Sequence, residues 1–388
     1  NEWMKYIARY GALKTCLEAE QFAEADKDLT RQVGAFQAFR QGFQERGAAL
    51  PDSAQKWGAG LASQLLASSD GRALQSGAQL AGSLRLKSAE PILVRLAGER
   101  PHGDGVRGTV FAALAAIDGP QFAPLLGKTL TDSSESRSLR EQVARQLGTI
   151  PQKEGRAQLV AALQTAPAET ASLIAEGLAG TREGAEQLLA LIEAGKASPR
   201  LLQERPIQVR LEQLRLPKWP ERFAKLTAGL PPADQRMDQL LRIRADSFRK
   251  AKPDAALGAK VFEKNCATCH QLGGKGAKVG PQLDGVGNRP VERLLEDILD
   301  PNRNVDPNFR TTRLTLKDGR DLLGLFLREE GEVVVLADDK GKEVRIEKKA
   351  IEERSISPLS PMPANWAEAM NETELNHLLA YLLQQRGK

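Results

Sequence analysis

The sequence predicts a mainly α-helical protein in which an array of stacked helix pairs is followed by a smaller domain carrying a short antiparallel β insertion. Three observations support this prediction. Aromatic residues make up only 5% of the 388 residues, whereas Ala and Leu recur in long stretches, which favours helix. Apolar residues recur at helical spacing through residues 1–250. After Pro253 the chain changes character, and short β-branched runs alternate with glycine turns.

The length of 388 residues allows two or three domains at ~150 residues each. We expect a helical repeat domain at residues 1–252 and a second domain at residues 253–388, with the β insertion at residues 308–356. Several prolines punctuate short helices between Leu201 and Lys252, which makes this stretch a natural place for a boundary.

The helical region contains an internal repeat. In each repeat two apolar residues four positions apart precede a break and a second apolar helix. The first helices carry Leu80/Leu84, Val110/Leu114, Val143/Leu147 and Ile174/Leu178, and the second helices are Pro91–Leu96, Phe122–Leu130, Leu159–Leu163 and Leu188–Ile192. Repeats of about 30 residues let each helix pair bury one face within the pair and another against the next pair. The pattern resembles a degenerate HEAT or armadillo-type solenoid, although Ala-rich helices also occur in ordinary bundles.

The net charge of +5 is unevenly placed, with +7 on residues 1–252 and −2 on residues 253–388. A basic helical region is one mark of a nucleic-acid-binding protein. Here both signs of charge are interspersed, with no basic run and no aromatic interleaving, so we expect no nucleic-acid partner. We also expect no transmembrane segment, because no stretch of about 18 uncharged apolar residues occurs.

The chain begins with Asn1 rather than Met, and residues 3–10 already have the pattern of an amphipathic helix. No positively charged segment followed by an apolar run is visible, so the sequence contains no recognisable signal peptide. We therefore expect a processed product or a fragment of a longer protein.

Two of the three cysteines and one of the three histidines lie together in Cys266-Ala267-Thr268-Cys269-His270. At the end of a helix, cysteines three positions apart lie on nearly one face, where each can form a thioether to a haem vinyl group, and the adjacent histidine can bind the iron. A thioredoxin-like redox pair would require a neighbouring βαβ unit, and the sequence shows no such pattern. Half of a zinc site would need further ligands, and the only other cysteine and histidine residues in the sequence are Cys16, His102 and His377. The element predicts one covalently bound haem c.

The surroundings of this element resemble the class I cytochrome c family. Residues 255–265 form a short amphipathic helix with Gly258 and Phe262 four positions apart, and residues 373–384 form another with Leu378 and Tyr381 on its apolar side. These residues match the crossing of the first and last helices in that family. The resemblance implies that the carbonyl of Pro281 accepts a hydrogen bond from the proximal imidazole.

The same resemblance implies two further site residues. Arg289, in Gly287-Asn288-Arg289, matches the arginine that often lies near a haem propionate. Met362, in the stiff Ser360-Pro361-Met362-Pro363 loop, stands where class I cytochromes carry their distal sulfur ligand. We expect Met370 to be a core residue and His377 to lie at a surface or edge. Ligation by His270 and Met362 would raise the potential relative to two histidines and leave no open position for oxygen or peroxide.

The 91 residues between His270 and Met362 contain more than a compact cytochrome needs. Short runs separated by glycine turns indicate a four- or five-stranded antiparallel sheet. The runs are Arg310–Leu316, Asp321–Arg328, Glu332–Ala337 and Glu343–Glu347, and the turns are Asp318-Gly319, Glu330-Gly331 and Asp339-Lys340-Gly341. The insertion has four candidate roles: covering a haem edge, forming a homodimer through its edge strands, docking an electron partner, or none beyond a tolerated surface insertion.

A cytochrome c interrupted by such a sheet is similar to the haem-binding domain appended to large exported proteins of planctomycetes and verrucomicrobia. In that family the cytochrome commonly follows helical repeats, which themselves follow a β-propeller resembling a sugar or alcohol dehydrogenase. The resemblance implies a fused dehydrogenase domain or a separate redox partner. Because haem is normally attached outside the cytoplasm, we expect a periplasmic or otherwise exported protein.

Three functions are open at this point. The favoured one is an electron-transfer module that relays electrons from a dehydrogenase domain or partner to a periplasmic acceptor. The alternatives are the C-terminal segment of a quinoprotein-like sugar or alcohol dehydrogenase that contributes to substrate oxidation, and an interaction scaffold with a haem sensor. Residues 1–250 supply no nucleotide-binding glycine loop, metal-ligand cluster or nucleophile–base pair, and His102 stands in a turn. We therefore expect an electron carrier and name no catalytic residue.

Overall fold

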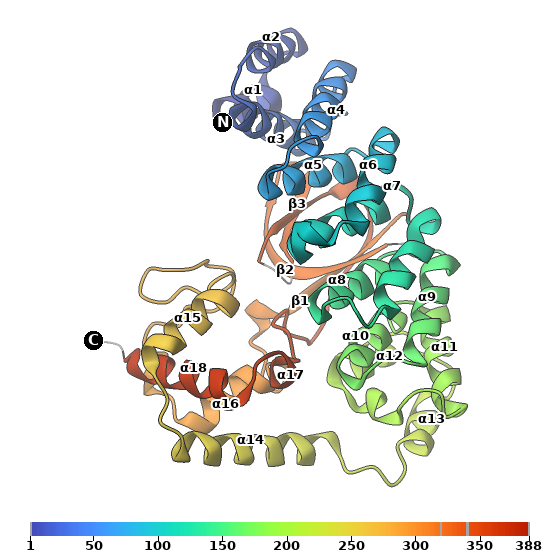
Figure 1. The fold of residues 1–388 in the computed structure, drawn as a ribbon, viewed down its shortest axis with the longest axis vertical. Coiled ribbons are helices and arrows are strands. Elements are labelled where there is room, and N and C mark those ends of the chain that lie inside the picture. Colours follow the sequence, from blue (N-terminus) through green and yellow to red (C-terminus); the bar gives the residue numbers. More distant parts are fainter. Residues whose placement is uncertain (1, 319, 339–340, 387–388) are drawn as a thin grey trace.

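The computed structural model of the chain describes residues 2–318, 320–338 and 341–386. An arc of helices starts at the N-terminus and leads through one long helix into a smaller C-terminal lobe, while a curled β-sheet lies in the hollow of the arc (Figure 1). The prediction of a mainly α-helical protein with a small antiparallel sheet is confirmed.

The helices before the predicted boundary are α1 (Glu2–Tyr10), α2 (Leu13–Glu24), α3 (Leu29–Glu45), α4 (Asp52–Leu66), α5 (Gly71–Ser83), α6 (Glu90–Gly98), α7 (Gly103–Thr131), α8 (Arg137–Gly148), α9 (Lys153–Leu163), α10 (Ala168–Leu178), α11 (Arg182–Glu193), α12 (Arg205–Gln213), α13 (Trp219–Leu226) and α14 (Ala233–Lys250). Those after it are α15 (Ala255–Asn265), α16 (Val291–Leu299), α17 (Trp366–Ala369) and α18 (Glu372–Gln384).

The helix pairs that the repeat predicts are present: α5 with α6, the two halves of α7, α8 with α9, and α10 with α11. The first helices of successive pairs pack side by side. Small residues permit this close approach, since a Cβ on Gly148 would lie 3.2 Å from the Cα of Gly177 in the neighbouring helix. Val143 and Leu147, one of the apolar pairs that define the repeat, are fully buried.

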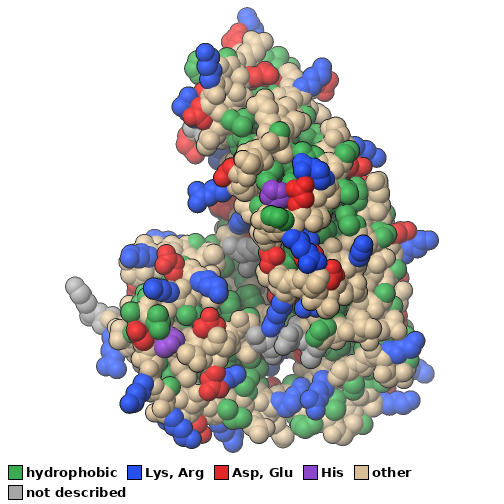
Figure 2. Space-filling view, in the orientation of Figure 1, with side chains coloured by type: hydrophobic (Ala, Val, Ile, Leu, Met, Phe, Trp, Pro, Cys, Tyr) green, Lys and Arg blue, Asp and Glu red, His purple; other side chains and the backbone are tan. Residues whose placement is uncertain are grey.

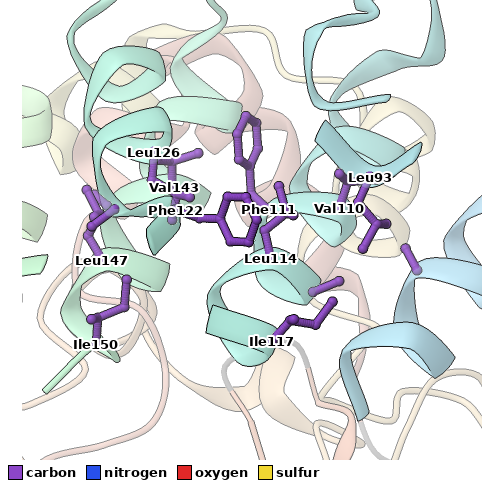
Figure 3. Packing of buried hydrophobic residues seen from close by; sticks show 14 of the residues in the cluster. Leu93, Val110, Phe111, Leu114, Ile117, Phe122, Leu126, Val143, Leu147 and Ile150 are labelled. Carbon is purple, nitrogen blue, oxygen red and sulfur yellow. The ribbon is translucent and has the colours of Figure 1, made fainter. Parts of the chain in front are cut away.

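Helix α7 is really two helices that meet at a kink. Asp118 has a non-helical backbone (φ −150°), and Pro120 follows it inside the helix. The buried side chains of Phe111 and Phe122 extend from the two halves into one core (Figure 3). By length and composition the stretch Arg100–Thr131 could cross a membrane, but 50% of its most apolar window is buried inside the protein. A core helix passes the same test, so the finding is weak evidence for a membrane span.

The C-terminal lobe has its own apolar core. Leu294 and Leu295 of α16 and Leu378 and Leu379 of α18 are buried in it together with residues of α15. Ala245 of α14 is buried in the same core, although α14 precedes the predicted boundary in the sequence. The boundary after Lys252 remains a prediction, and α14 is the element that joins the arc to the lobe (Figure 1).

The insertion forms a five-stranded antiparallel sheet in the order β4-β3-β2-β1-β5. The strands are β1 (Thr311–Leu316), β2 (Asp321–Glu330), β3 (Val333–Ala337), β4 (Glu343–Glu347) and β5 (Ile351–Ile356). Leu314, Leu316, Val334, Leu336 and Ile346 give the sheet a small core of its own. Strands β1 to β4 therefore lie where the alternating runs predict them, and β5 is the fifth strand of the expected four- or five-stranded sheet. Of the predicted turns, Gly319 and Asp339-Lys340 fall outside the described residues.

The sheet is fastened to the N-terminal helices. Glu332 donates its backbone N–H to the carbonyl of Glu45, the last residue of α3, at 2.8 Å. The carboxylate of Glu45 is fully buried and bonds Arg345 of β4 at 3.0 Å and Arg9 of α1 at 2.8 Å. Because a buried charge needs partners, these contacts make the insertion part of the body of the protein.

Candidate haem site

The two cysteines and His270 lie in a helical turn that directly follows α15. Asp254 caps the start of α15 by accepting from Ala256 N at 2.7 Å. At the other end the backbone N–H of Cys266 bonds the carbonyl of Phe262 at 2.8 Å, and that of His270 bonds the carbonyl of Cys266 at 2.9 Å. This helical turn places the sulfur atoms and the imidazole at one end of the helix, as the sequence predicts.

Helices α15 and α18 cross at Gly258. A side chain at this position would overlap the carbonyl oxygen of His377, so only glycine allows the two backbones to come this close. Beside the crossing, the rings of Phe262 and Tyr381 lie 5.7 Å apart. His377 itself accepts a hydrogen bond on Nδ1 from the backbone of Asp254 at 2.8 Å, which places it at the edge of the crossing.

The imidazole of His270 is oriented by Pro281. Its Nδ1 lies 2.8 Å from the carbonyl oxygen of Pro281. A carbonyl only accepts, so Nδ1 carries the proton and Nε2 keeps the lone pair that binds iron. Burial lowers the pKa of His270, against the opposing effect of the Pro281 hydrogen bond, and this also favours the neutral ring. Gly280 makes room for the ring, because a Cβ there would lie 2.8 Å from it.

Neither Cys266 nor Cys269 forms a disulfide bond, and both are partly buried. Burial, together with the neighbouring Cys269, raises the pKa of the Cys266 thiol to about 12. Among the described residues no group of three or more Cys, His, Asp or Glu side chains could hold a metal ion. Two cysteines outside any disulfide, beside a neutral, oriented imidazole, fit a covalently attached haem.

The loop after His270 folds back onto the attachment motif. The backbone N–H groups of Val279 and Gly280 both donate to the carbonyl of Cys269, at 3.0 and 2.7 Å. Gly276 takes a left-handed conformation (φ +96°), and a side chain there would overlap the carbonyl of His270. The loop thereby fixes both Pro281 and the histidine relative to α15.

The β insertion reaches the same motif. Gly341, which precedes β4 and has φ +70°, lies against the carbonyl of Thr268, and a Cβ there would lie 3.2 Å from the sulfur of Cys269. Gly341 therefore borders the attachment site on the cysteine side. Of the roles expected for the insertion, covering one haem edge agrees with this position.

Met362 lies in a loop held by a chain of hydrogen bonds. Its backbone N–H donates to Oγ of Ser360 at 3.1 Å, and the N–H of Ser360 donates to Oδ1 of Asn302 at 2.8 Å. Asn302 is buried, and its carbonyl accepts from Arg205 of α12 at 2.9 Å. Met362 is partly buried, whereas Met370 is buried in the apolar core of the lobe. The structure thus offers Met362, rather than Met370, to a ligand outside the core.

Arg289 lies in an ion pair that the sequence did not predict. Its guanidinium bonds the carboxylate of Asp297 on α16, which also receives Arg293 at 3.0 Å. The side chain of Arg289 is 53% exposed. The guanidinium of Arg289, which the resemblance assigns to a haem propionate, is thus paired with Asp297 of α16. The propionate role stays a prediction.

The remaining cysteine and histidine have structural surroundings. Cys16 is fully buried in α2 and donates to the carbonyl of Ile7 at 3.3 Å. Nε2 of His102 lies 2.7 Å from a carboxylate oxygen of Glu99, three residues earlier in the chain. Neither lies in the C-terminal lobe with the haem motif.

One comparison with known families bears on this region. The family model described as cytochrome c matches residues 255–314. The match supports a class I cytochrome c domain in this region. The match begins at the first residue of α15, includes the cysteines, His270 and Pro281, and ends inside β1. It supports a haem-binding electron-transfer module that carries haem c. No curated protein matches the chain.

Three residues near the cytochrome site were not predicted from the sequence to take part in it: Asn302, Gly341 and Ser360, the last through its hydroxyl group. Ser360 carried a usable signal, since a serine two positions before a residue often bonds its backbone N–H in a turn. Asn302 and Gly341 carried none, because their contacts are with segments far away in the sequence.

Proposed function

We propose that the chain is an electron-transfer module with a single covalently bound haem c, ligated by His270 and Met362. One observation carries the proposal. Nδ1 of His270 lies 2.8 Å from the carbonyl of Pro281, which leaves Nε2 for iron beside Cys266 and Cys269 at the end of α15, neither of which forms a disulfide bond.

The residues have separate tasks in this function. Bound haem supplies the one-electron chemistry. Cys266 and Cys269 hold it covalently, and Pro281 keeps His270 in the tautomer that binds iron. The Ser360 and Asn302 hydrogen bonds fix the loop whose Met362 thioether would be the second ligand of the iron. A thioether ligand favours the reduced state and closes the sixth position, which suits a relay.

We further propose that the domain is of the planctomycete and verrucomicrobial type and that residues 1–252 are HEAT-like repeats. The five-stranded sheet between His270 and Met362 supports the first point, and the stacked helix pairs α5 to α11 support the second. Under this proposal the protein works in the periplasm or outside the cell. Its electron donor is a dehydrogenase domain or partner, and its acceptor is a periplasmic carrier.

The proposal is tested by producing the full chain in a host that attaches haem c. The expected product carries one haem per chain, has a narrow α-band typical of low-spin haem when reduced, and does not bind carbon monoxide. A high-spin spectrum, or ready carbon monoxide binding to the ferrous form, would overturn the assignment of Met362. Cys266→Ala with Cys269→Ala should give a chain without covalent haem.

The same preparation separates a relay from a dehydrogenase segment. A relay reduces no dye when it is offered a panel of sugars and alcohols, because its residues bind no substrate. Turnover without an added dehydrogenase would show instead that the chain itself oxidises substrate.

A further inference from the structure

A large groove separates the cytochrome lobe from the helical arc. Its volume is about 1810 Å³, and Figure 2 shows the hollow on one face of the molecule. Helices α8, α10, α12 and α14 line one wall, β1 and β2 line the second, and the loop that carries Met362 lines the third. Pockets for small ligands usually measure about 300–1,000 Å³, so this groove is large enough for a polypeptide segment.

The lining is cationic. Arg and Lys side chains outnumber Asp and Glu among the described lining residues. Some of the carboxylates are already occupied within the wall, because Glu176 pairs with Arg210 and Asp300 pairs with Arg303, each at 2.7 Å. A ligand in the groove therefore meets a surplus of positive charge.

Several of these cations face uncharged partners or solvent. Arg236 donates to the amide oxygen of Gln203 and to the carbonyl of Pro231. Arg310 has a buried Nε with no hydrogen-bond partner among the described residues. Arg200 on the helical wall and Lys342 beside β4 are exposed. Carboxylates of a partner can reach positive charge from opposite walls of the groove.

The position of the groove connects it to the cytochrome site. Ser360 and Met362 form part of its lining, and Lys342 directly follows Gly341, which touches the cysteine motif. A chain seated in the groove would lie beside the loop of the proposed iron ligand.

We propose that this groove docks an acidic segment of the redox protein that exchanges electrons with the haem. The inference rests on the proposed function and adds the chemistry of the partner. On docking, one electron crosses between the partner's one-electron cofactor and the haem, and no covalent bond forms or breaks. Among the described lining residues only Phe223 is aromatic, so the groove lacks the stacking surfaces of a single-stranded nucleic-acid site.

The binding test uses the full haem-loaded chain and a fluorescein-labelled decaglutamate peptide at low salt, followed by fluorescence anisotropy. Arg200→Glu and Lys342→Glu should each weaken binding about three- to tenfold, because each reverses an exposed charge on one wall. Arg72→Glu is the matched control, since Arg72 is an exposed arginine outside the groove, and it should change binding by less than about twofold. Added salt should weaken binding to the wild-type chain.

A kinetic test connects the groove to the haem. Lys342→Glu should slow oxidation of the reduced haem by anionic ferricyanide about threefold and should not slow oxidation by the cationic tris(phenanthroline)cobalt(III). Equal changes with both oxidants would contradict a local charge effect.

Three results of the binding test would overturn the proposal: no binding of the peptide, equal weakening by Arg72→Glu, or tighter binding of a labelled dT12 oligonucleotide. A high-spin haem would overturn the proposed function instead. Because the peptide titration does not depend on the state of the haem, the two failures are distinguishable.

Discussion

Asn302 accepts a hydrogen bond on its side-chain oxygen from the backbone N–H of Ser360 at 2.8 Å, two residues before Met362. The carbonyl of the same asparagine accepts from Arg205 on α12 at 2.9 Å. A single buried residue thereby joins the helical arc to the loop of the proposed iron ligand. We infer that the geometry of the methionine side of the haem depends on the arc as well as on the cytochrome domain.

Replacing this asparagine should weaken the bond between sulfur and iron. Asn302→Ala leaves the N–H of Ser360 without its partner, which costs about 1–2 kcal/mol in a buried setting. Because the thioether stabilises the ferrous state, the midpoint potential should fall by about 40 mV for each kcal/mol lost from that state. An optical redox titration measures the shift.

The matched control is Asn304→Ala, which removes an exposed asparagine whose amide bonds Glu296 at 3.1 Å. It should leave the potential unchanged. Equal potentials in Asn302→Ala and the wild type would show that the loop is held by other contacts.

The buried carboxylate of Glu45 should matter more for stability than surface charges do. Glu45→Ala leaves Arg9 and Arg345 without their shared partner, and the loss of one member of a buried ionic cluster costs about 3–5 kcal/mol. Urea unfolding should report this loss as a lower free energy of unfolding. Glu347→Ala, which removes a surface pair with Lys349, should cost less than about 1 kcal/mol. Comparable losses in the two variants would contradict the burial argument.

The attachment of the sheet should weaken in acid. Desolvation on its own would raise the pKa of Glu330, but hydrogen bonds with Glu45, Arg345 and Arg328 outweigh it and lower that pKa well below its ordinary value of 4.5. A group with a lowered folded-state pKa stabilises the protein above its unfolded pKa, and this stabilisation is lost as the pH falls toward the folded value. The free energy of unfolding should therefore begin to fall below about pH 5.

Glu330→Gln tests this origin of the acid sensitivity. The variant should be less stable than the wild type by about 1–2 kcal/mol at pH 7, and the difference should shrink as the pH is lowered to about 3. Urea unfolding at a series of pH values gives both curves. Parallel curves would mean that other carboxylates control the acid response.

The crossing of α15 and α18 should tolerate only glycine at position 258. Gly258→Ala places a methyl group on the carbonyl of His377, and such overpacking costs about 1–3 kcal/mol or more. Gly60→Ala is the control, because nothing lies within 4 Å of the added Cβ and alanine suits a helix interior better. Thermal unfolding should show a lower midpoint for the first variant and an unchanged or higher one for the second.

The helix pairs and strands could be predicted because their signals are local. Apolar residues at helical spacing define α5 to α11, and short alternating runs with glycine turns define β1 to β4. The attachment motif was equally readable, since Cys266, Cys269 and His270 are adjacent in the sequence and lie within one helical turn.

The contacts between distant segments could not be predicted. Glu45 and Arg345 are 300 positions apart, and neither stands in a pattern that points to the other. Arg289 was placed by resemblance alone, whereas the fold offers it Asp297 on α16. The burial of Ala245 in the cytochrome core likewise follows from packing, because α14 has the composition of an ordinary amphipathic helix.

The proposed relay depends on one haem with histidine and methionine ligands. An optical redox titration of the full chain, repeated on Met362→Ala and Met370→Ala, tests it most directly. We predict a single one-electron wave for the wild type, a lower midpoint with loss of the sulfur-to-iron charge-transfer band in Met362→Ala, and retention of that band in Met370→Ala. A Met362→Ala variant with the spectrum and midpoint of the wild type would contradict the claim.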